Sequence, residues 1–317
     1  AGRREPMPFT AQELQRAADA EGMIFPDFVL DQIVAALDAG KHVILTGPPG
    51  TGKTTLAYLA AEVAQKAMWC TGYLPTTATT EWTTYETIGG LQPGADGLFF
   101  RPGLFVEAIE SGRWLVIDEL NRSNFDRAFG QLFTVLSGSA VVLPFKRAGQ
   151  PMPLSLVPAG QEEPAETEPI RLPATWRIIA TMNVFDKNLL FEMSYALMRR
   201  FAFIEVPAPS DDAYHKLLSR PGGEIVQMLL PLREFADLGP AVFLDAARYV
   251  QRRQQDAITE SRLIFEAFYA YFLPQFEGVN DALAVNLFRS VNQLLDVPEQ
   301  KELRRTIRDV LGINPPA

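Results

Sequence analysis

The chain has 317 residues, of which 47% are hydrophobic and 21% charged, and its formal net charge is −9. This composition is typical of a globular protein of one large or two medium domains, and the acidic balance argues against binding DNA or RNA through a broad basic surface. The sequence has no apolar run of about 18 residues or more, and its start, AGRREPMPF, has no apolar core. We therefore expect neither a membrane span nor a signal peptide.

The cysteine and histidine content narrows the chemistry further. A single cysteine, Cys70, excludes an internal disulfide and fits a reducing cytoplasm, so we expect a cytoplasmic protein. Cys70 itself is expected to be a buried apolar residue. His42 and His215 are isolated from other ligand residues, which disfavours a metal site made by side chains alone. The missing initiator Met indicates a trimmed chain or a piece of a longer protein.

The first expected elements are helical and then extended. Residues 12–40 have helical apolar spacing, and Gly40 ends the helix. The side chains expected on its buried face are Phe28, Ile33, Val34 and Leu37. The run HVILTG (42–47) is typical of a buried parallel strand, and a helix follows from about Lys53 to Lys66.

Further apolar runs complete an α/β pattern. The expected strands are 42–47, 113–120, 176–183 and 201–206. Strands that alternate with helical stretches predict a parallel sheet sandwiched by helices. We therefore expect an N-terminal helical segment (1–40), an α/β nucleotide-binding domain (41–207) and a smaller helical lid domain (208–317).

Two regions depart from the strand pattern. Residues 144–173 are rich in Pro and Glu, which predicts a surface hairpin or mobile loop inserted into the α/β domain. After PAPS (207–210) the strand signal ends and helical patterns dominate, as in 241–256, 260–276 and 281–296.

The segment GPPGTGKT (47–54) matches the phosphate-loop pattern G-x-x-x-x-G-K-[ST]. Glycines let backbone N–H groups converge on phosphates, and the following helix directs its positive end there. Lys53 is expected to reach the β and γ phosphates, and Thr54 to bind Mg²⁺.

The strand WLVID, followed by Glu119, brings two carboxylates to the sheet edge where α/β proteins place ligands. Asp118 is expected to contact Mg²⁺ through water, and Glu119 to polarise the water that attacks the γ-phosphate. A carboxylate pair after a strand is weak evidence alone, and the phosphate loop upstream strengthens it.

Three further polar residues have two interpretations each. Asn183, at the end of IIATMN, either holds the lytic water with Glu119 or merely starts a turn. Arg199 and Arg200 either favour a helix dipole or, in a ring, reach a neighbour's γ-phosphate.

The order and spacing of GPPGTGKT, VIDELNRSN (116–124), ATMN (180–183) and ALMRRF (196–201) resemble the AAA+ ATPase superfamily. Within it, DELNRSNFDRAFGQLFTVLSG and ATMNVFDKNLLFEMSYALMRRF look most like the McrB/dynein-related branch, which includes the nucleotide-driven subunit of methylcytosine-specific restriction. WTTYETIGGLQPGADGLFFRPGLFVEAIESGRW (82–114) is similar to the segment that this branch places before Walker B. The resemblance covers roughly residues 25–290 and is loose in the lid.

The resemblance implies roles position by position. The Walker A residues that bind nucleotide are Gly47, Pro48, Pro49, Gly50, Thr51, Gly52, Lys53, Thr54 and Thr55. Asp118 and Glu119 match Walker B, Asn183 matches sensor 1, and Arg199 and Arg200 match the arginine-finger region, with Arg200 preferred. Arg262 either matches sensor 2 or is a surface arginine. Asn121 and Arg122 match a DE-x-NR motif that links the site to the subunit interface.

Three functions fit these motifs. The preferred one is the Mg²⁺-dependent ATP- or GTP-hydrolysing motor of a McrB-like defence complex: a homo-oligomeric ring, expected to be a hexamer, with a separate effector such as a McrC-like nuclease. The second is a MoxR-like chaperone that remodels partner proteins. The third is a non-hydrolysing nucleotide switch, which would need neither Glu119, Asn183 nor the arginines.

The sequence leaves the base preference and the substrate open. No motif distinguishes ATP from GTP. Only about 40 residues precede the first strand, so we expect no DNA-reading domain in this chain. Direct DNA contact is not supported by the acidic composition. Either the loop 144–173 or the aromatic run LFFRPGLF (98–105) contacts a partner or substrate, or the two segments are an idle solvent loop and packed core aromatics.

Overall fold

The computed structural model describes residues 6–94, 97–183, 198–276 and 278–314. Its contacts divide the chain into two compact units. The first comprises Ala1–Glu21, Phe25–Gly47 and Lys53–Val206, and the second comprises Gly22–Ile24, Pro48–Gly52 and Pro207–Ala317. Residues 184–197, which carry part of the family resemblance between Asn183 and Arg199, lie outside the described residues. Residues 1–5 of the expected N-terminal segment and 315–317 of the expected lid domain do so as well.

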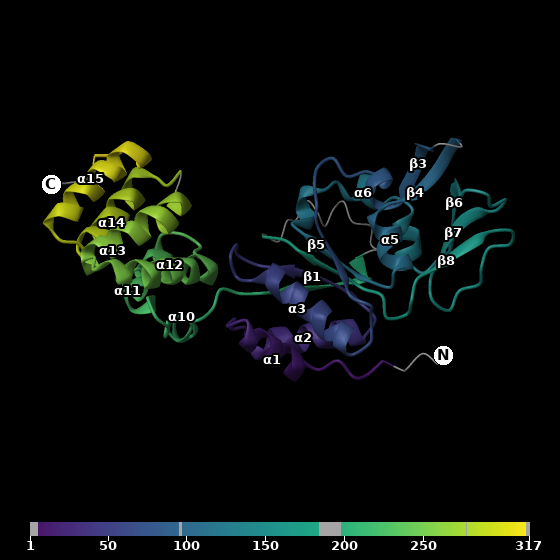
Figure 1. Cartoon of the computed structure of the whole chain (residues 1–317), viewed down its shortest axis with the longest axis horizontal. Helices are drawn as coiled ribbons and strands as arrows, with labels where there is room; N and C mark the ends of the chain where they lie inside the picture. Colours follow the sequence, from purple (N-terminus) through teal and green to yellow (C-terminus); the bar gives the residue numbers. More distant parts are fainter. Residues whose placement is uncertain (1–5, 95–96, 184–197, 277, 315–317) are drawn as a thin grey trace. The chain divides into compact units, whose positions relative to one another are not determined.

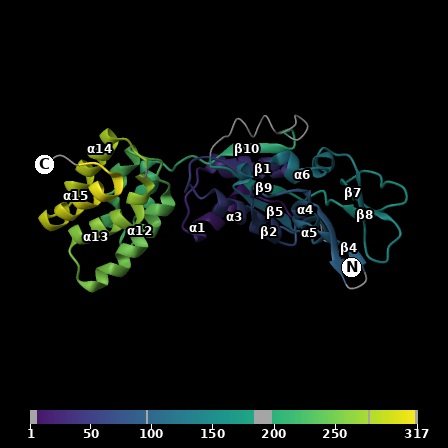
Figure 2. The ribbon, with the colours of Figure 1, turned by 90° about the horizontal axis from the view of Figure 1, so that it is seen from above.

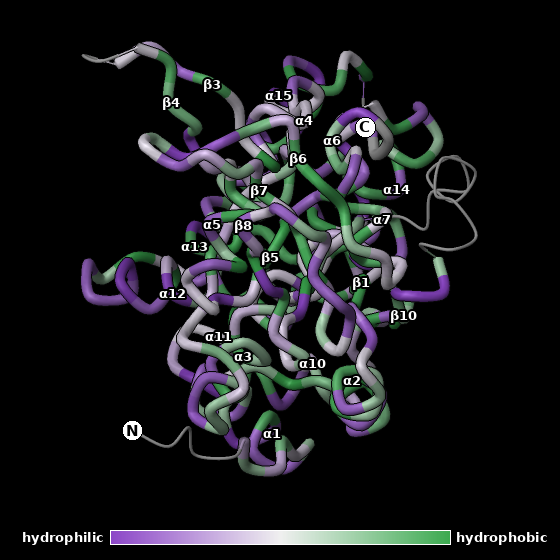
Figure 3. The backbone as a smooth tube through the Cα atoms, turned by 90° about the vertical axis from the view of Figure 1, so that its right-hand side faces the viewer, coloured by the Kyte–Doolittle hydropathy of each residue, from purple (hydrophilic) through white to green (hydrophobic). Residues whose placement is uncertain are grey.

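The first unit is built on a parallel sheet, which in the described residues has the strand order β10-β1-β9-β5-β2. The strands are β1 (His42–Thr46), β2 (Tyr73–Thr77), β5 (Trp114–Asp118), β9 (Ile178–Thr181) and β10 (Phe201–Glu205). Strands β1 and β9 are buried along their whole length, and Figure 3 shows the hydrophobic colouring of β1 and β5. Because the pairs are parallel, the carboxyl ends of the strands lie at one edge.

The four strands expected from the apolar runs are confirmed, and β2 is an additional strand. Its sequence, YLPTT, is half exposed and contains Pro75. Proline is tolerated in an edge strand because one side of that strand makes no ladder hydrogen bonds, and β2 pairs only with β5 in the described sheet.

Helices cover both faces of this sheet. The helices in the described part of the first unit are α1 (Ala11–Ala20), α2 (Asp27–Asp38), α3 (Lys53–Lys66), α4 (Thr84–Thr87), α5 (Leu104–Glu110), η1 (Leu120–Arg122), α6 (Phe125–Phe129) and α7 (Leu132–Leu136). Figure 1 shows α1, α2 and α3 on one side of the sheet and α5 and α6 on the other. This is the expected parallel sheet between helices.

The N-terminal segment forms two helices, and one part of its predicted buried face is wrong. Helix α1 starts at a capping box made by Thr10 and Glu13. In α2 the buried residues are Val29, Leu30, Ile33 and Leu37. Phe28 is 54% exposed, because α2 begins at Asp27 and its apolar stripe runs through the next two positions instead. Val34 is half-buried at the edge of the stripe.

The region 144–173 is more ordered than the sequence indicates. It contributes to a mixed sheet of β6 (Val141–Lys146), β7 (Pro153–Val157) and β8 (Glu168–Arg171). In this sheet β6 and β7 are antiparallel, and β7 and β8 are parallel. The last four residues of β7 are buried. The antiparallel pair β6–β7 is a hairpin, as one of the two alternatives predicts, whereas the other alternative, a mobile loop, is wrong for the strands. Pro144, Pro153 and Pro169 lie within the strands themselves, so the proline content of the region does not mark a loop.

A second hairpin lies next to this sheet. It consists of β3 (Gly89–Gly94) and β4 (Gly97–Pro102). Phe100 of β4 stacks on Phe145 of β6 with ring centroids 5.0 Å apart. Figures 1 and 2 show both structures at the same end of the unit. Within the aromatic run 98–105, Phe100 and Phe105 are buried, whereas Leu98 is 68% exposed.

The second unit is helical in its described part, as expected from residue 208 onward. Its helices are α10 (Asp211–Leu217), α11 (Gly223–Gln227), η2 (Leu230–Glu234), α12 (Pro240–Arg253), η3 (Gln254–Asp256), α13 (Glu260–Ala267), the π-helix η4 (Phe268–Phe272), η5 (Leu273–Phe276), α14 (Asp281–Asn292) and α15 (Val297–Leu311). Its core is rich in aromatic rings, including Tyr214, Phe243, Phe268, Phe272 and Phe276. None of the helices in the described residues of the chain is long and apolar enough to cross a bilayer.

Candidate nucleotide site

The glycine-rich turn connects the buried strand β1 to the first turn of α3. Gly47, Gly50 and Gly52 all have positive φ. At Gly47 the φ is 140°, and a Cβ there would lie 2.3 Å from the carbonyl oxygen of Val206. Only glycine fits this position, because any side chain would collide with the backbone that follows β10. Within the turn, the Thr51 hydroxyl donates to the Pro48 carbonyl at 3.1 Å.

Lys53 is the first residue of α3 and lies at the centre of the motif. It is 5% exposed, and its Nζ donates to the carbonyl of Gly47 at 3.1 Å. Burial lowers the pKa of Lys53, and the nearby negative charge of Asp118 partly opposes this shift. A buried cation beside a turn of backbone N–H groups is suited to an anionic ligand such as a phosphate chain.

The remaining Walker A residues line the turn and the start of α3. Thr51 is buried, Gly47, Pro48, Gly52, Thr54 and Thr55 are half-buried, and Pro49 and Gly50 are exposed. The hydroxyl of Thr54 donates to Oδ1 of Asp118 at 2.7 Å. A hydroxyl and a carboxylate at this distance are oxygen ligands of the kind that Mg²⁺ prefers, so the donor set fits the metal expected there.

The residues after β5 are held in an unusual conformation. Glu119 has φ 52° and ψ 48°, the left-handed region that costs a non-glycine residue about 1–2 kcal/mol. Its Oε2 forms an ion pair with Nε of Arg122 at 2.7 Å. The amide Nδ2 of Asn183 lies 3.4 Å from Oε1 of Glu119. The structure therefore places the side chain of Asn183 beside the glutamate, which is the arrangement that the first of its two interpretations requires.

Thr181 is a site residue that the sequence reasoning missed. Its hydroxyl donates to Oδ1 of Asp118 at 2.5 Å and accepts the backbone N–H of Glu119 at 3.1 Å. Its side chain is almost completely buried at the end of β9, two residues before Asn183. The available signal was a hydroxyl within the otherwise apolar run IIATM, at the strand end where Asp118 also lies.

The two arginines of ALMRRF lie at the other edge of the sheet. They immediately precede β10, whose first residue, Phe201, pairs with His42 at the start of β1. β1 is five residues long, which is roughly 13–16 Å. Arg199 is exposed, and Nη2 of Arg200 donates to the Ser137 carbonyl at 2.7 Å. The structure thus does not bring these arginines to the phosphate turn of their own chain.

Arg262 is engaged inside the helical unit. Its Nε lies 3.1 Å from Glu266 and its Nη1 lies 2.6 Å from Glu302. Glu266 also accepts hydrogen bonds from Arg253 and Tyr249, and these contacts lower the pKa of Glu266 to about 2. The guanidinium of Arg262 is therefore part of a structural ion-pair network, whatever its part in nucleotide binding.

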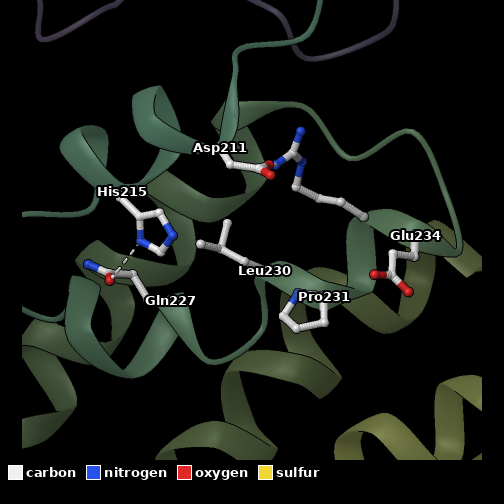
Figure 4. A pocket seen from close by; sticks show the side chains of 7 residues that line it. Asp211, His215, Gln227, Leu230, Pro231 and Glu234 are labelled. Carbon is white, nitrogen blue, oxygen red and sulfur yellow. Dashed lines mark hydrogen bonds and ion pairs between the residues drawn. The ribbon is translucent and has the colours of Figure 1, made fainter.

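The helical unit also contains a cavity of about 490 Å³. Figure 4 shows the residues that line it, with His215 directed to Gln227. His215 Nδ1 lies 3.2 Å from Gln227, and Arg233 forms an ion pair with Asp211 at 2.5 Å and lies over the Tyr214 ring. These groups are engaged with one another and do not form a catalytic arrangement.

The strand order, the glycine turn before α3 and the polar residues at the carboxyl edge define a P-loop nucleotide-binding fold. Comparison with known families agrees: residues 42–201 match the AAA domain (dynein-related subfamily). This match covers half of the chain, and the chain belongs to that family. The resemblance to the McrB/dynein-related branch of AAA+ proteins is thereby confirmed.

Several curated relatives share this region. The Type IV methyl-directed restriction enzyme EcoKMcrB subunit of Escherichia coli (strain K12) is 28% identical over 212 residues, which are 63% of this chain and 42% of the relative. The protein YojN of Bacillus subtilis (strain 168) is 28% identical over 182 residues, 56% of this chain and 52% of the relative. The matched region thus spans about half the length of these relatives.

Solved structures show weaker similarity. The RuvB Holliday junction branch migration motor of Thermotoga maritima is 14% identical, with a TM-score of 0.47 over 92% of this chain and 83% of that one. A similarity at this level supports no inference about substrate or partner.

Proposed function

We propose that the chain is a Mg²⁺-dependent nucleoside triphosphatase that hydrolyses ATP or GTP as part of a cytoplasmic ring-forming motor. The observation that carries this proposal is the cluster at the carboxyl edge of the sheet. Thr54, Asp118 and Thr181 are joined there by hydrogen bonds, and Glu119 follows Asp118 directly. A protein that only bound nucleotide would need the phosphate turn and the magnesium ligands, but not Glu119 with Asn183 beside it.

The residues divide the work between binding and chemistry. The backbone N–H groups of the turn and the ammonium of Lys53 would hold the phosphates. Thr54 and Asp118 would hold Mg²⁺, which supplies neutralisation of phosphate charge when bound. Glu119 would accept a proton from the attacking water, and Asn183, 3.4 Å from the carboxylate, would help to orient that water.

The arginines support a site shared between subunits. Arg199 and Arg200 lie at the sheet edge opposite the phosphate turn, so within one chain they are badly placed for catalysis. In a ring, this edge of one subunit can face the phosphate edge of the next, and Arg200 would then stabilise the charge on the transferred phosphoryl group. We propose a homo-oligomeric ring, with a hexamer as the expected state.

The relatives suggest what such a motor serves. The E. coli relative is named as a subunit of a methyl-directed restriction enzyme. We propose that this chain is the motor of a comparable defence complex and acts with a separate effector, such as a McrC-like nuclease. With a formal charge of −9, contact with DNA would be made mainly by such a partner.

The test is hydrolysis of ATP and of GTP by the wild type and by Glu119→Gln. The variant should bind fluorescent nucleotide with unchanged affinity and hydrolyse it at least about 100-fold more slowly, because general-base catalysis contributes about 10²–10⁴. Glu81→Gln, at an exposed carboxylate of the same unit, is the matched control and should keep wild-type turnover. Full turnover by Glu119→Gln would refute the assignment.

A further inference from the structure

Thr181 occupies a position where an apolar side chain would be expected. It ends β9, whose four residues are all buried, and Ala180 and Met182 on either side of it are buried as well. Its own side chain is 2% exposed. Valine has nearly the same shape and equal preference for a strand, so packing alone gives no reason for a hydroxyl here.

Both hydrogen-bonding capacities of the hydroxyl are used by the Walker B residues. The O–H donates to Oδ1 of Asp118, the same oxygen that accepts the hydroxyl of Thr54. The oxygen of Thr181 accepts the backbone N–H of Glu119. One atom therefore ties the side chain of one carboxylate residue to the backbone of the next.

This contact coincides with the backbone strain of the site. Glu119 has a positive φ of 52°, and strained residues persist only where their surroundings hold them. The N–H of Glu119 is the donor fixed by Thr181. Loss of the acceptor would let the peptide between Asp118 and Glu119 rotate, and the Glu119 carboxylate would leave its place beside Asn183.

We propose that Thr181 is a positioning residue that fixes the metal-binding orientation of Asp118 and the left-handed backbone of Glu119 together. The catalytic part of this inference rests on the proposed nucleotide hydrolysis. The structural part does not, because the hydrogen bonds that join the three residues are made within the chain itself. It predicts effects on metal-dependent binding and on turnover, with little effect on metal-independent nucleotide binding by the phosphate turn.

The first measurement needs neither nucleotide nor turnover. In the full chain, hydrogen exchange resolved at the Glu119 amide should be at least about 100-fold slower than in an unstructured peptide. Thr181→Val should accelerate it about tenfold or more relative to the amides of β5, and Thr181→Ser should restore slow exchange. A Glu119 amide that exchanges freely in the folded wild type would overturn the proposal without any variant.

The second measurement follows binding and turnover in the same variants. Thr181→Val should bind fluorescent nucleotide in EDTA within about twofold of wild type. It should need at least about fivefold more Mg²⁺ to reach its Mg²⁺-dependent affinity, and its turnover should fall at least about 30-fold. Thr181→Ser should recover most of both. Thr87→Val is the matched control, since Thr87 is equally buried and donates to the carbonyls of Thr83 and Ala128 instead.

The outcomes separate the two proposals. If the wild type hydrolyses no nucleotide, the proposed function fails, while amide exchange and Mg²⁺ titration still decide the role of Thr181. If Thr181→Val matches the wild type in exchange and Mg²⁺ requirement, the positioning role is wrong. Equal losses in Thr181→Val and Thr181→Ser would also overturn it, because they would show that packing and not the hydroxyl matters.

Discussion

Nε of Arg122 lies 2.7 Å from Oε2 of Glu119, so the carboxylate proposed as general base is ion-paired within its own loop. The left-handed backbone at Glu119 makes this possible, because it turns the chain into η1 and brings the residue three positions later back to the carboxylate. The side chain of Arg122 is 60% exposed, so the same guanidinium is also accessible from outside the loop.

Replacing Arg122 by Ala should lower turnover about tenfold while leaving nucleotide affinity unchanged, because Glu119 would lose one of its two orienting contacts. The turnover of Arg122→Lys should lie between that of the wild type and that of Arg122→Ala. The free energy of unfolding of Arg122→Ala should stay within about 1 kcal/mol of the wild-type value, because exposed ion pairs contribute little to stability. Steady-state hydrolysis and urea unfolding provide the measurements. Arg16→Ala, at an exposed arginine of α1, is the control, and equal turnover in both variants would exclude a role for the pair.

The arginines at the amino edge of the sheet make a prediction about subunit mixing. Arg200→Ala should bind nucleotide normally and lose at least about 100-fold in turnover if it acts as an arginine finger. Lys53→Ala should lose binding in its own site. Because each variant retains what the other lacks, a mixture should regain part of the wild-type rate. A mixture no more active than its separate components would argue against catalysis across a subunit interface.

Gly47 gives a steric prediction for the phosphate turn. Its φ is 140°, and a Cβ added there would lie 2.3 Å from the Val206 carbonyl oxygen, so Gly47→Ala must displace the turn or the end of β10. We expect the substitution to lower the free energy of unfolding by about 2–3 kcal/mol. We also expect it to abolish measurable nucleotide binding. Gly149→Ala is the control, since its φ is 73° but a Cβ would meet nothing within 4 Å, and it should cost about 1 kcal/mol. Equal effects of the two substitutions would contradict the steric argument.

The part of this site that could be predicted from sequence follows from the burial of the central strands. β1, β5 and β9 are enclosed by helices and neighbouring strands, so each is a continuous apolar run that ends in polar residues. The phosphate turn, Asp118 and Asn183 are therefore visible in the sequence, and their meeting at one edge follows from the parallel arrangement. β2 was missed because an edge strand needs no such run.

The remaining contacts depend on pairings that no local pattern encodes. Thr181 matters because β9 lies next to β5, and the sequence does not state which strands are neighbours. The pair between Arg122 and Glu119 depends on a left-handed backbone at a glutamate, which residue preferences disfavour. The strands β6 to β8 were obscured because each of them contains a proline, a residue that is depleted in strands.

Arg177 makes a prediction about how α2 is attached to the sheet. It is 6% exposed, and its guanidinium donates to the carbonyls of Leu37, Ala174 and Trp176. Leu37 is in the last turn of α2, where a cation also favours the helix dipole. Arg177→Met should lower the unfolding free energy of the first unit by about 2–4 kcal/mol, since the carbonyls of Leu37 and Trp176 lose a buried donor. Arg16→Met should change it by less than about 0.5 kcal/mol, and similar losses in both would contradict this role.

His42 makes the stability of the first unit depend on pH. It is buried at the start of β1, its Nδ1 accepts the N–H of Ile178 at 3.0 Å, and burial, with the charges of Arg177 and Arg200, lowers its pKa from 6.5 to about 3. The folded state therefore resists a proton that the unfolded state takes up below pH 6.5.

The sign follows from this difference in proton binding. Above pH 6.5 neither state is protonated at His42 and the contribution is constant. Below it, stability should fall by about 1.4 kcal/mol per pH unit, and the loss should level off near pH 3. Between pH 7.5 and 5.0 we expect about 2 kcal/mol to be lost through this residue.

All four tryptophans (Trp69, Trp82, Trp114 and Trp176) are in the first unit, so urea unfolding followed by their fluorescence measures that unit. His42→Gln should start from a lower stability at pH 7.5, since it loses the ring contacts with Trp176 and Phe201, but should lose about 2 kcal/mol less than wild type on acidification. Parallel pH profiles for wild type and variant would show that His42 is not held neutral by the fold.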